Sequence, residues 1–229
     1  MFSINFPDPR RHEFTEWVLF GDYYYNARDI IGFGGGLSVK NLRKAYRAGI
    51  FPWHIEGLPL PWFCPERRAV LEFEELYIPR TLRKEWKKTN FTFTIDKDFR
   101  QVIENCAKAK RDGESGTWIT KNFIESYCEL HAAGDAHSIE VWENKDLVGG
   151  LYGIDAGGVF CGESMFHLAP NASKLALLFL IKHLRSRGSA WLDIQVMTPH
   201  LEILGAKEIE RKKFLDKLEE IQAKNLNLF

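Results

Sequence analysis

From residue 91 onwards, apolar and polar residues recur at spacings that alternate between those of strands and those of helices. Residues 91–95 alternate as a strand does, and the next segment carries apolar side chains every three or four residues, as a helix does. A second helix is predicted after Thr120, a good N-terminal cap, and it ends at Gly134. These elements belong to the larger predicted domain, residues 69–229.

The pattern changes to a period of two between residues 138 and 160. Three strands are predicted there, and short turns at 144–146 and 156–158 join them into a β-meander. The following segment, which ends at Arg187, is apolar on nearly all sides, as is typical of a buried helix. Strands and helices that alternate in this way predict a mixed α/β (α+β) fold.

Residues 191–197 have the pattern of a strand that carries two polar side chains, Asp193 and Gln195, on one face. Because the strand follows a buried helix, we expect it to be central. A carboxylate and an amide buried there destabilise the fold by roughly 2–7 kcal/mol unless both are hydrogen-bonded. The pair therefore indicates either a structural polar network, such as an ion pair between Asp193 and Lys174, or a functional site.

Residues 1–68 are predicted to form a smaller N-terminal α+β domain. Ser38 is a good N-terminal cap for a helix that places Tyr46 on its apolar face. The stretch 49–65 is rich in proline and aromatic residues, which makes either a stiff stacking surface or a loop buried against the core. The glycine-rich turn at 32–36 lacks the lysine of a phosphate-binding loop, so a nucleotide site is not favoured there.

The balance of charge is even over the chain but uneven along it. The formal net charge is zero, so a nucleic-acid partner would have to bind a local basic patch. The densest basic segment is predicted to be helical, and it is either a solvated helix face or a phosphate-binding surface. Its basic residues are Arg80, Arg83, Lys84, Lys87 and Lys88.

The cysteines, the N-terminus and the apolar runs indicate which classes of protein are excluded. None of the four cysteines lies in a Cys-x-x-Cys pair and no histidine is spaced to complete a zinc site, so no metal is predicted. The N-terminus lacks the pattern of a signal peptide, and the longest strongly apolar run, 175–181, is too short to span a bilayer. We expect a cytoplasmic protein with no membrane partner.

Several short motifs occur in an order that points to one family. They are Gly-Ile-Phe-Pro-Trp (49–53), Thr-Trp-Ile-Thr (117–120), Ala-His-Ser-Ile-Glu-Val-Trp (136–142), Leu-Val-Gly-Gly-Leu-Tyr-Gly (147–153), Gly-Glu-Ser-Met-Phe (162–166), Asn-Ala-Ser-Lys (171–174), Asp-Ile-Gln-Val (193–196) and Pro-His-Leu-Glu-Ile-Leu-Gly-Ala (199–206). The order of elements from residue 91 resembles the N-acetyltransferase (GNAT-like) fold. The motifs together resemble the leucyl/phenylalanyl-tRNA–protein transferase family.

The resemblance implies an activity and its partners. Such an enzyme moves Leu or Phe, less often Met, from aminoacyl-tRNA to the N-terminal α-amine of proteins that begin with Arg or Lys. The product is marked for bacterial N-end-rule degradation. No metal and no cofactor are implied. The chain departs from the usual family pattern at Gly36, Phe63 and His167.

The resemblance also implies roles for individual residues. Asp193 would orient and polarise the amide of Gln195, whose oxygen would accept a hydrogen bond from the attacking amine, and Glu163 would be a supporting acid. Trp118 precedes a predicted helix at a position typical of exposed residues. The other implied residues are Trp53, Trp118 and Tyr46 at the terminal adenosine, Met165, Phe179 and Ile194 in the aminoacyl side-chain pocket, and Arg80, Arg83, Lys84, Lys87 and Lys88 on tRNA phosphates.

Three other functions compete with this one. An acyl-CoA-dependent N-acetyltransferase needs a glycine-rich pyrophosphate loop before the buried helix, but residues 167–173 contain no glycine. A non-catalytic tRNA-binding module would use the tryptophans and the basic segment but would not need Asp193 and Gln195. A peptidoglycan-type transferase that uses aminoacyl-tRNA usually has two such domains, for which this chain is too short.

Overall fold

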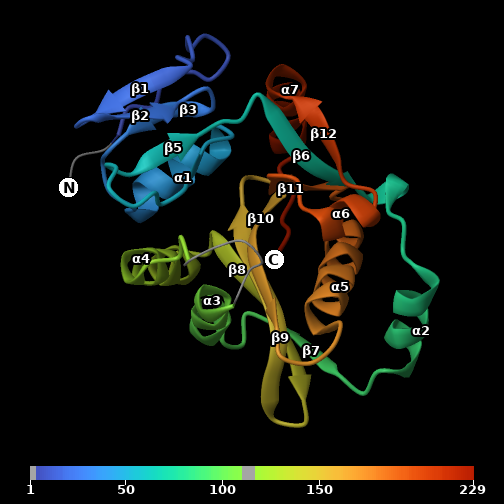
Figure 1. Cartoon of the computed structure of the whole chain (residues 1–229). Coiled ribbons are helices and arrows are strands. Elements are labelled where there is room, and N and C mark those ends of the chain that lie inside the picture. Colours follow the sequence, from blue (N-terminus) through green and yellow to red (C-terminus); the bar gives the residue numbers. More distant parts are fainter. Residues whose placement is uncertain (1–3, 110–116) are drawn as a thin grey trace.

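A seven-stranded mixed sheet forms the centre of the molecule in the computed structural model, which describes residues 4–109 and 117–229 (Figure 1). Its strand order is β12-β6-β11-β10-β9-β8-β7, so β11 is central, as expected. The strands are β6 (Arg67–Glu72), β7 (Thr92–Ile95), β8 (Ala136–Glu143), β9 (Asp146–Asp155), β10 (Phe160–His167), β11 (Trp191–Gln195) and β12 (Lys207–Glu210).

The predicted meander is confirmed as β8, β9 and β10, which pair antiparallel. Strand β10 then pairs parallel with β11, and the crossover between them is the helix α5 (Ala172–Ser186). This helix packs on one face of the sheet, whereas α3 (Phe99–Lys108) and α4 (Lys121–Ala132) lie on the other (Figure 1). Two faces covered by helices explain why the strands of the meander are buried along most of their length.

The remaining elements of the larger part lie around the sheet (Figure 1). The basic segment is a helix, as predicted, and it lies outside α5 in Figure 1. Strand β6 comes first in the sequence among the strands of this sheet, and it lies between β11 and β12. These elements are η1 (Phe73–Glu75), α2 (Arg80–Lys88), α6 (Pro199–Ile203) and α7 (Arg211–Gln222).

The N-terminal part contains two small sheets and one helix. Strands β1 (Trp17–Phe20) and β2 (Tyr23–Asn26) form an antiparallel hairpin. Strands β3 (Ile30–Phe33), β5 (Pro61–Phe63) and β4 (Phe51–Pro52) form the second sheet in that order. The helix α1 (Val39–Arg47) begins at the predicted cap, since the Ser38 side chain accepts a hydrogen bond from the backbone of Asn41.

One hydrophobic cluster joins both parts of the chain. It contains residues of α1 and β5 as well as residues of α3, α4, β10 and α7. A second cluster lies between α5 and the other face of the sheet. The division into domains 1–68 and 69–229 stays a prediction, because shared burial of this kind does not separate two independent cores.

Candidate active site

The first polar group at the centre of the sheet is a fully buried ion pair. The Arg68 guanidinium on β6 donates to both carboxylate oxygens of Asp193 on β11, at 2.8 Å from Nε and 2.6 Å from Nη2. The two side chains are 1% and 0% exposed. Burial lowers the pKa of Arg68, but the neighbouring Asp193 carboxylate raises it by more, so the net shift is upward. Arg68, and not Lys174, is therefore the partner of Asp193.

Aromatic rings enclose this ion pair. The Arg68 guanidinium carbon lies 4.7 Å from the centre of the Phe51 ring and 4.4 Å from the centre of the Phe214 ring. Cation–π contacts of this kind stabilise a desolvated guanidinium. The two rings belong to β4 and α7. The Arg68–Asp193 pair therefore lies where the N-terminal part, β6 and the C-terminal helix pack together.

The second polar group joins β10 to β11. The Gln195 amide nitrogen donates a hydrogen bond of 2.6 Å to one oxygen of the Glu163 carboxylate. Gln195 is buried, whereas Glu163 keeps partial exposure. No ion pair of Glu163 occurs among the described residues. Burial raises the pKa of Glu163 to about 7, although the Gln195 amide and the Tyr46 hydroxyl act in the opposite direction.

Two β-bulges place these side chains. The pairing of β10 with β9 is irregular between Gly162 and Ser164, and the pairing of β11 with β6 is irregular between Asp193 and Gln195. Gln195 also has a φ of 60°, which is rare for a residue other than glycine. A bulge re-aims a side chain out of the regular alternation of a strand. Glu163 and Gln195 meet for this reason.

Beyond residue 193 the strand differs from the prediction. Strand β11 ends at Gln195 and not at Met197, and the bulge breaks the alternation that placed both polar side chains on one face. Asp193 accepts a hydrogen bond of 3.0 Å from the backbone N–H of Gln195. The Gln195 amide itself is oriented by Glu163, so Asp193 positions the backbone of Gln195.

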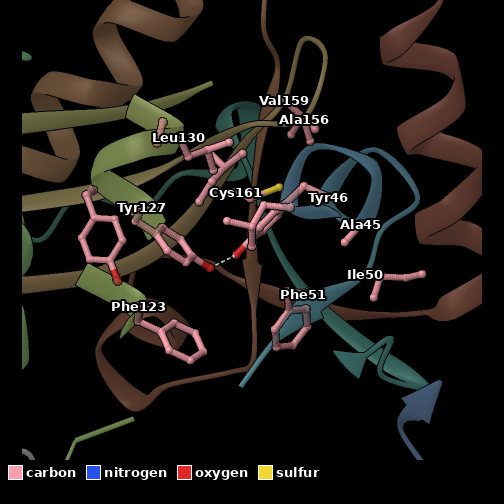
Figure 2. Close-up of a cluster of buried hydrophobic side chains, with 14 of the residues drawn as sticks. Ala45, Tyr46, Ile50, Phe51, Phe123, Tyr127, Leu130, Ala156, Val159 and Cys161 are labelled. Atoms are coloured by element: carbon pink, nitrogen blue, oxygen red, sulfur yellow. Dashed lines mark hydrogen bonds between the residues drawn. The ribbon is translucent and has the colours of Figure 1, made fainter. Parts of the chain in front are cut away.

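Two buried tyrosines continue the group on the side of α1 and α4. The hydroxyl of Tyr127 donates to Glu163 at 3.4 Å, and the hydroxyls of Tyr46 and Tyr127 lie 2.5 Å apart (Figure 2). Burial first and the Glu163 carboxylate second raise the pKa of both tyrosines. Tyr46 therefore belongs to the surroundings of Glu163, and its 1% exposure leaves it no surface for an adenosine ring.

The two predicted adenosine-binding tryptophans lie together. The rings of Trp53 and Trp118 stack with their centres 4.9 Å apart and an interplanar angle of 27°. Trp118 is 7% exposed, so the expectation that it is exposed is wrong. Its ring is covered because Phe123 of α4 packs against its edge. A further ring can stack on Trp53, which is partly exposed.

The three predicted pocket residues do not form one group. All are partly buried at the margin of the cluster under α5. Met165 follows Glu163 on β10 and Ile194 precedes Gln195 on β11, so both lie close to the polar group. Phe179 instead stacks on Phe93 of β7, with ring centres 5.1 Å apart. Strand β7 is the third strand from β10, roughly 14 Å across the sheet.

The predicted phosphate-binding residues of α2 are all exposed. No ion pair is described for any of them, although the described residues contain many other ion pairs. Residues of α2 thus form a basic face that is open to solvent. The described residues contain no group of three or more His, Cys, Asp or Glu that could hold a metal ion.

Sequence reasoning missed Arg68 and Tyr127. The signal for Arg68 was an arginine inside the apolar strand pattern of 67–71, and the signal for Tyr127 was a hydroxyl on the apolar face of a predicted helix. Both are polar groups at positions that the pattern itself assigns to the interior. Such groups require a buried partner, but the pattern does not say which.

Chemically, the polar group can hold and release a proton near neutral pH. A carboxyl whose pKa is about 7 exists in both forms there, and such a group is suited to general acid–base catalysis. The Gln195 amide is held by Glu163 through its nitrogen, which leaves its oxygen as an acceptor for an N–H group. The arrangement therefore fits a reaction in which an amine loses a proton.

Comparison with known proteins gives the family. The model of the leucyl/phenylalanyl-tRNA protein transferase family matches residues 70–219, and the model of its N-terminal domain matches residues 35–66. The leucyl/phenylalanyl-tRNA–protein transferase of Flavobacterium johnsoniae is 46% identical over 205 residues, which cover 87% of this chain and 97% of that protein. The one from Pseudoalteromonas atlantica is 45% identical over 218 residues, with 95% and 88% covered.

Among solved structures, L-PGS from Bacillus licheniformis is similar at a TM-score of 0.41 and 13% identity, over 66% of this chain and 48% of that one. A likeness at this level carries no argument about the site. None of the helices in the described part of the chain has the length and apolar character needed to cross a membrane. The chain belongs to the leucyl/phenylalanyl-tRNA–protein transferase family, whose members are aminoacyl-tRNA–protein transferase enzymes.

Proposed function

We propose that this protein transfers Leu or Phe, less often Met, from aminoacyl-tRNA to the N-terminal α-amine of cytoplasmic proteins that begin with Arg or Lys. The product enters bacterial N-end-rule degradation. The observation that supports this reaction best is the Glu163–Gln195 hydrogen bond at a double bulge, which joins an acid of pKa about 7 to an oriented amide. Such a pair suits an amine as nucleophile.

In this reaction the amine nitrogen attacks the ester carbonyl carbon, the new C–N bond forms, and the bond to the tRNA 3′-oxygen breaks. The Gln195 oxygen accepts a hydrogen bond from the amine and so aligns its lone pair. An α-amine has a pKa of about 7.7–8.0, close to that of Glu163. Glu163 therefore takes the amine proton, which finally passes to the leaving 3′-oxygen.

Positioning supplies most of the acceleration in this proposal. The aminoacyl ester is already activated, and correct alignment of two reactants contributes roughly 7–11 kcal/mol to lowering a barrier. An amide is too weak a base to remove the proton fully, so Gln195 aligns and Glu163 accepts. Asp193 acts as a positioning residue, because it holds the backbone N–H of Gln195 and is itself held by Arg68.

The other parts of the site are proposed from the family and supported by their placement. The terminal adenosine stacks on Trp53, which Trp118 supports from beneath. Met165 and Ile194 contact the Leu or Phe side chain, and Phe179 borders the same hydrophobic cluster farther from the reacting atoms. The basic face of α2 binds tRNA phosphates, a contact that weakens as salt is raised.

A transfer assay tests the proposal. Labelled Leu-tRNA and Phe-tRNA are incubated with model proteins that begin with Arg, Lys or Ala. We expect label on the Arg and Lys proteins alone. Gln195→Ala should lose transfer, while Gln101→Ala, a change of the same chemistry at an exposed position of α3, should keep it. Binding of tRNA without transfer by the wild type would instead favour a binding module, and dependence on acyl-CoA would favour an acetyltransferase.

A further inference from the structure

A groove lies between α2 and α5. The two helices lie beside each other at the outside of the molecule, on the side of α5 away from the sheet (Figure 1). We call the space between them the α2–α5 groove. Its volume is about 330 Å³, within the size range of pockets that hold small ligands or parts of larger ones. None of its residues belongs to the Glu163 group. It is lined by Leu76, Ile78, Arg83, Trp86, Lys87, Leu178, Ile181, Lys182 and Arg185.

Four cations line the groove, two from each helix. Arg83 and Lys87 are one turn apart on α2, and Lys182 and Arg185 are nearly one turn apart on α5. All four are exposed, and no acidic residue lines the groove. No ion pair is described for any of them. In a chain of zero net charge, four unneutralised cations on two facing banks leave a local positive potential that attracts an anion.

The two arginines are held in place by the backbone nearby. The Arg83 Nε donates a hydrogen bond of 2.9 Å to the carbonyl oxygen of Ile78, and Arg185 donates to the carbonyl oxygen of Phe73. One hydrogen bond leaves the other donors of each guanidinium available. Both carbonyls belong to the segment that leads from β6 to α2, so this one segment holds an arginine on each bank of the groove.

The walls between the cations are apolar and include an aromatic ring. Trp86 is partly exposed and packs on Phe93, with ring centres 5.3 Å apart. Leu178 and Ile181 of α5 face it across the groove. An aromatic and aliphatic slot between cations matches the two halves of a nucleotide, because a base stacks or packs on apolar surface while its phosphates contact Lys and Arg.

We propose that the tRNA-binding surface extends from α2 across to α5, and that the α2–α5 groove holds one unstacked nucleotide of the tRNA. Its base packs against Trp86, and the flanking phosphates contact Lys182 and Arg185 on one bank and Arg83 and Lys87 on the other. This inference rests on the proposed function, since that function supplies the tRNA. The groove adds a base contact and the cations of α5 to a tRNA-binding surface that would otherwise consist of α2 alone.

Binding of an unacylated tRNA-Leu transcript, measured over a series of salt concentrations, tests the groove. Lys182→Ala with Arg185→Ala should weaken binding and lower the slope of log affinity against log salt by roughly 1.5, since two phosphate contacts are lost. The matched control is Lys145→Ala with Lys224→Ala, two exposed cations outside the groove. Trp86→Leu should weaken binding roughly tenfold with the slope unchanged, while Trp86→Phe should stay within about twofold.

Circular dichroism and urea denaturation of each variant show whether the protein is still folded. A folded Trp86→Leu variant that binds tRNA as tightly as the wild type would overturn the base contact. A Lys182 and Arg185 double variant that behaves like its control would overturn the extension to α5. Wild type that binds tRNA but does not transfer its amino acid would overturn the proposed function while these tests still decide the groove. If the wild type transfers its amino acid but neither variant differs from its control in tRNA binding, the groove proposal alone would be overturned.

Discussion

Two carboxylates on neighbouring strands of one sheet have opposite surroundings. Asp193 on β11 is fully buried and receives two hydrogen bonds from the Arg68 guanidinium. Glu163 on β10 is partly exposed and receives hydrogen bonds from a neutral amide and a neutral phenol. The first carboxylate is paired with a cation, whereas no ion pair is described for the second, whose pKa burial raises to about 7.

This difference separates two kinds of experiment. A substitution of Asp193 removes one half of a buried ion pair, so lost activity in such a variant reports lost stability together with any lost chemistry. A substitution of Glu163 leaves no buried cation without a partner. The chemistry of the site is therefore better tested at Glu163 and Gln195 than at Asp193.

The largest expected effect is on stability. Arg68→Leu leaves the Asp193 carboxylate buried without its cation, and we expect the free energy of unfolding to fall by about 3–5 kcal/mol. Urea denaturation measures it. The neighbouring Arg67→Leu is the control, since Arg67 is 55% exposed and its contact to Glu208 is 3.9 Å. Equal losses from Arg67→Leu and Arg68→Leu would contradict the structural role of the pair.

The next effect is on rate. Glu163→Gln keeps the shape of the side chain but removes the proton acceptor, and we expect kcat for transfer to fall by roughly 10²–10⁴-fold. Urea denaturation should show a stability close to that of the wild type. Glu143→Gln, at the exposed end of β8, should leave kcat unchanged. A Glu163→Gln enzyme within about threefold of wild type would mean that positioning alone carries the reaction.

The pH dependence of both rate and stability should follow Glu163. Its pKa is about 7 in the folded protein against an ordinary 4.5, so between these values the folded state binds more protons than the unfolded state. Its contribution to stability is present below pH 4.5 and is lost as the pH rises through 7. The rate of transfer should rise over the same range, because the ionised form accepts the proton. Both dependences should be absent in Glu163→Gln, and an unchanged pH profile there would assign them to another group.

The smallest expected effect concerns a tyrosine. The Tyr46 hydroxyl lowers the pKa of Glu163, so Tyr46→Phe should move the midpoint of the pH–rate profile upward with little change in the KM for aminoacyl-tRNA. Tyr77→Phe, at a residue that is 58% exposed, is the control. A raised KM with an unmoved midpoint would return Tyr46 to the adenosine site that the family resemblance implied.

Local periodicity predicted the elements well and their partners poorly. The meander, the buried α5 and the central β11 follow from spacings within 10 to 20 residues, so the mixed α/β class and the strand of Gln195 were accessible from local spacing, whereas Glu163 was implied only by the family resemblance. The Arg68–Asp193 pair joins residues 125 positions apart, and no local pattern encodes that β6 lies beside β11. The two bulges were equally hidden, because one extra residue in a strand leaves its apolar pattern almost unchanged.

The prediction that Trp118 is exposed failed for a similar reason. Its position before α4 suggests exposure, yet Trp53, 65 residues earlier, covers its face. Aromatic residues on stiff loops find partners that only the tertiary fold determines. Tyr46 was correctly placed on the apolar face of α1, but its hydroxyl meets that of Tyr127, a partner 81 residues away that no local pattern gives.

The position of β6 between β11 and β12 also has a consequence for synthesis. A ribosome adds about 5–20 residues per second, so Asp193 emerges roughly 6–25 s after Arg68, which precedes it by 125 residues. Throughout that interval the nascent chain carries an apolar strand and an arginine whose place in the sheet does not yet exist. The centre of the sheet is thus completed late in translation, when β11 joins β6.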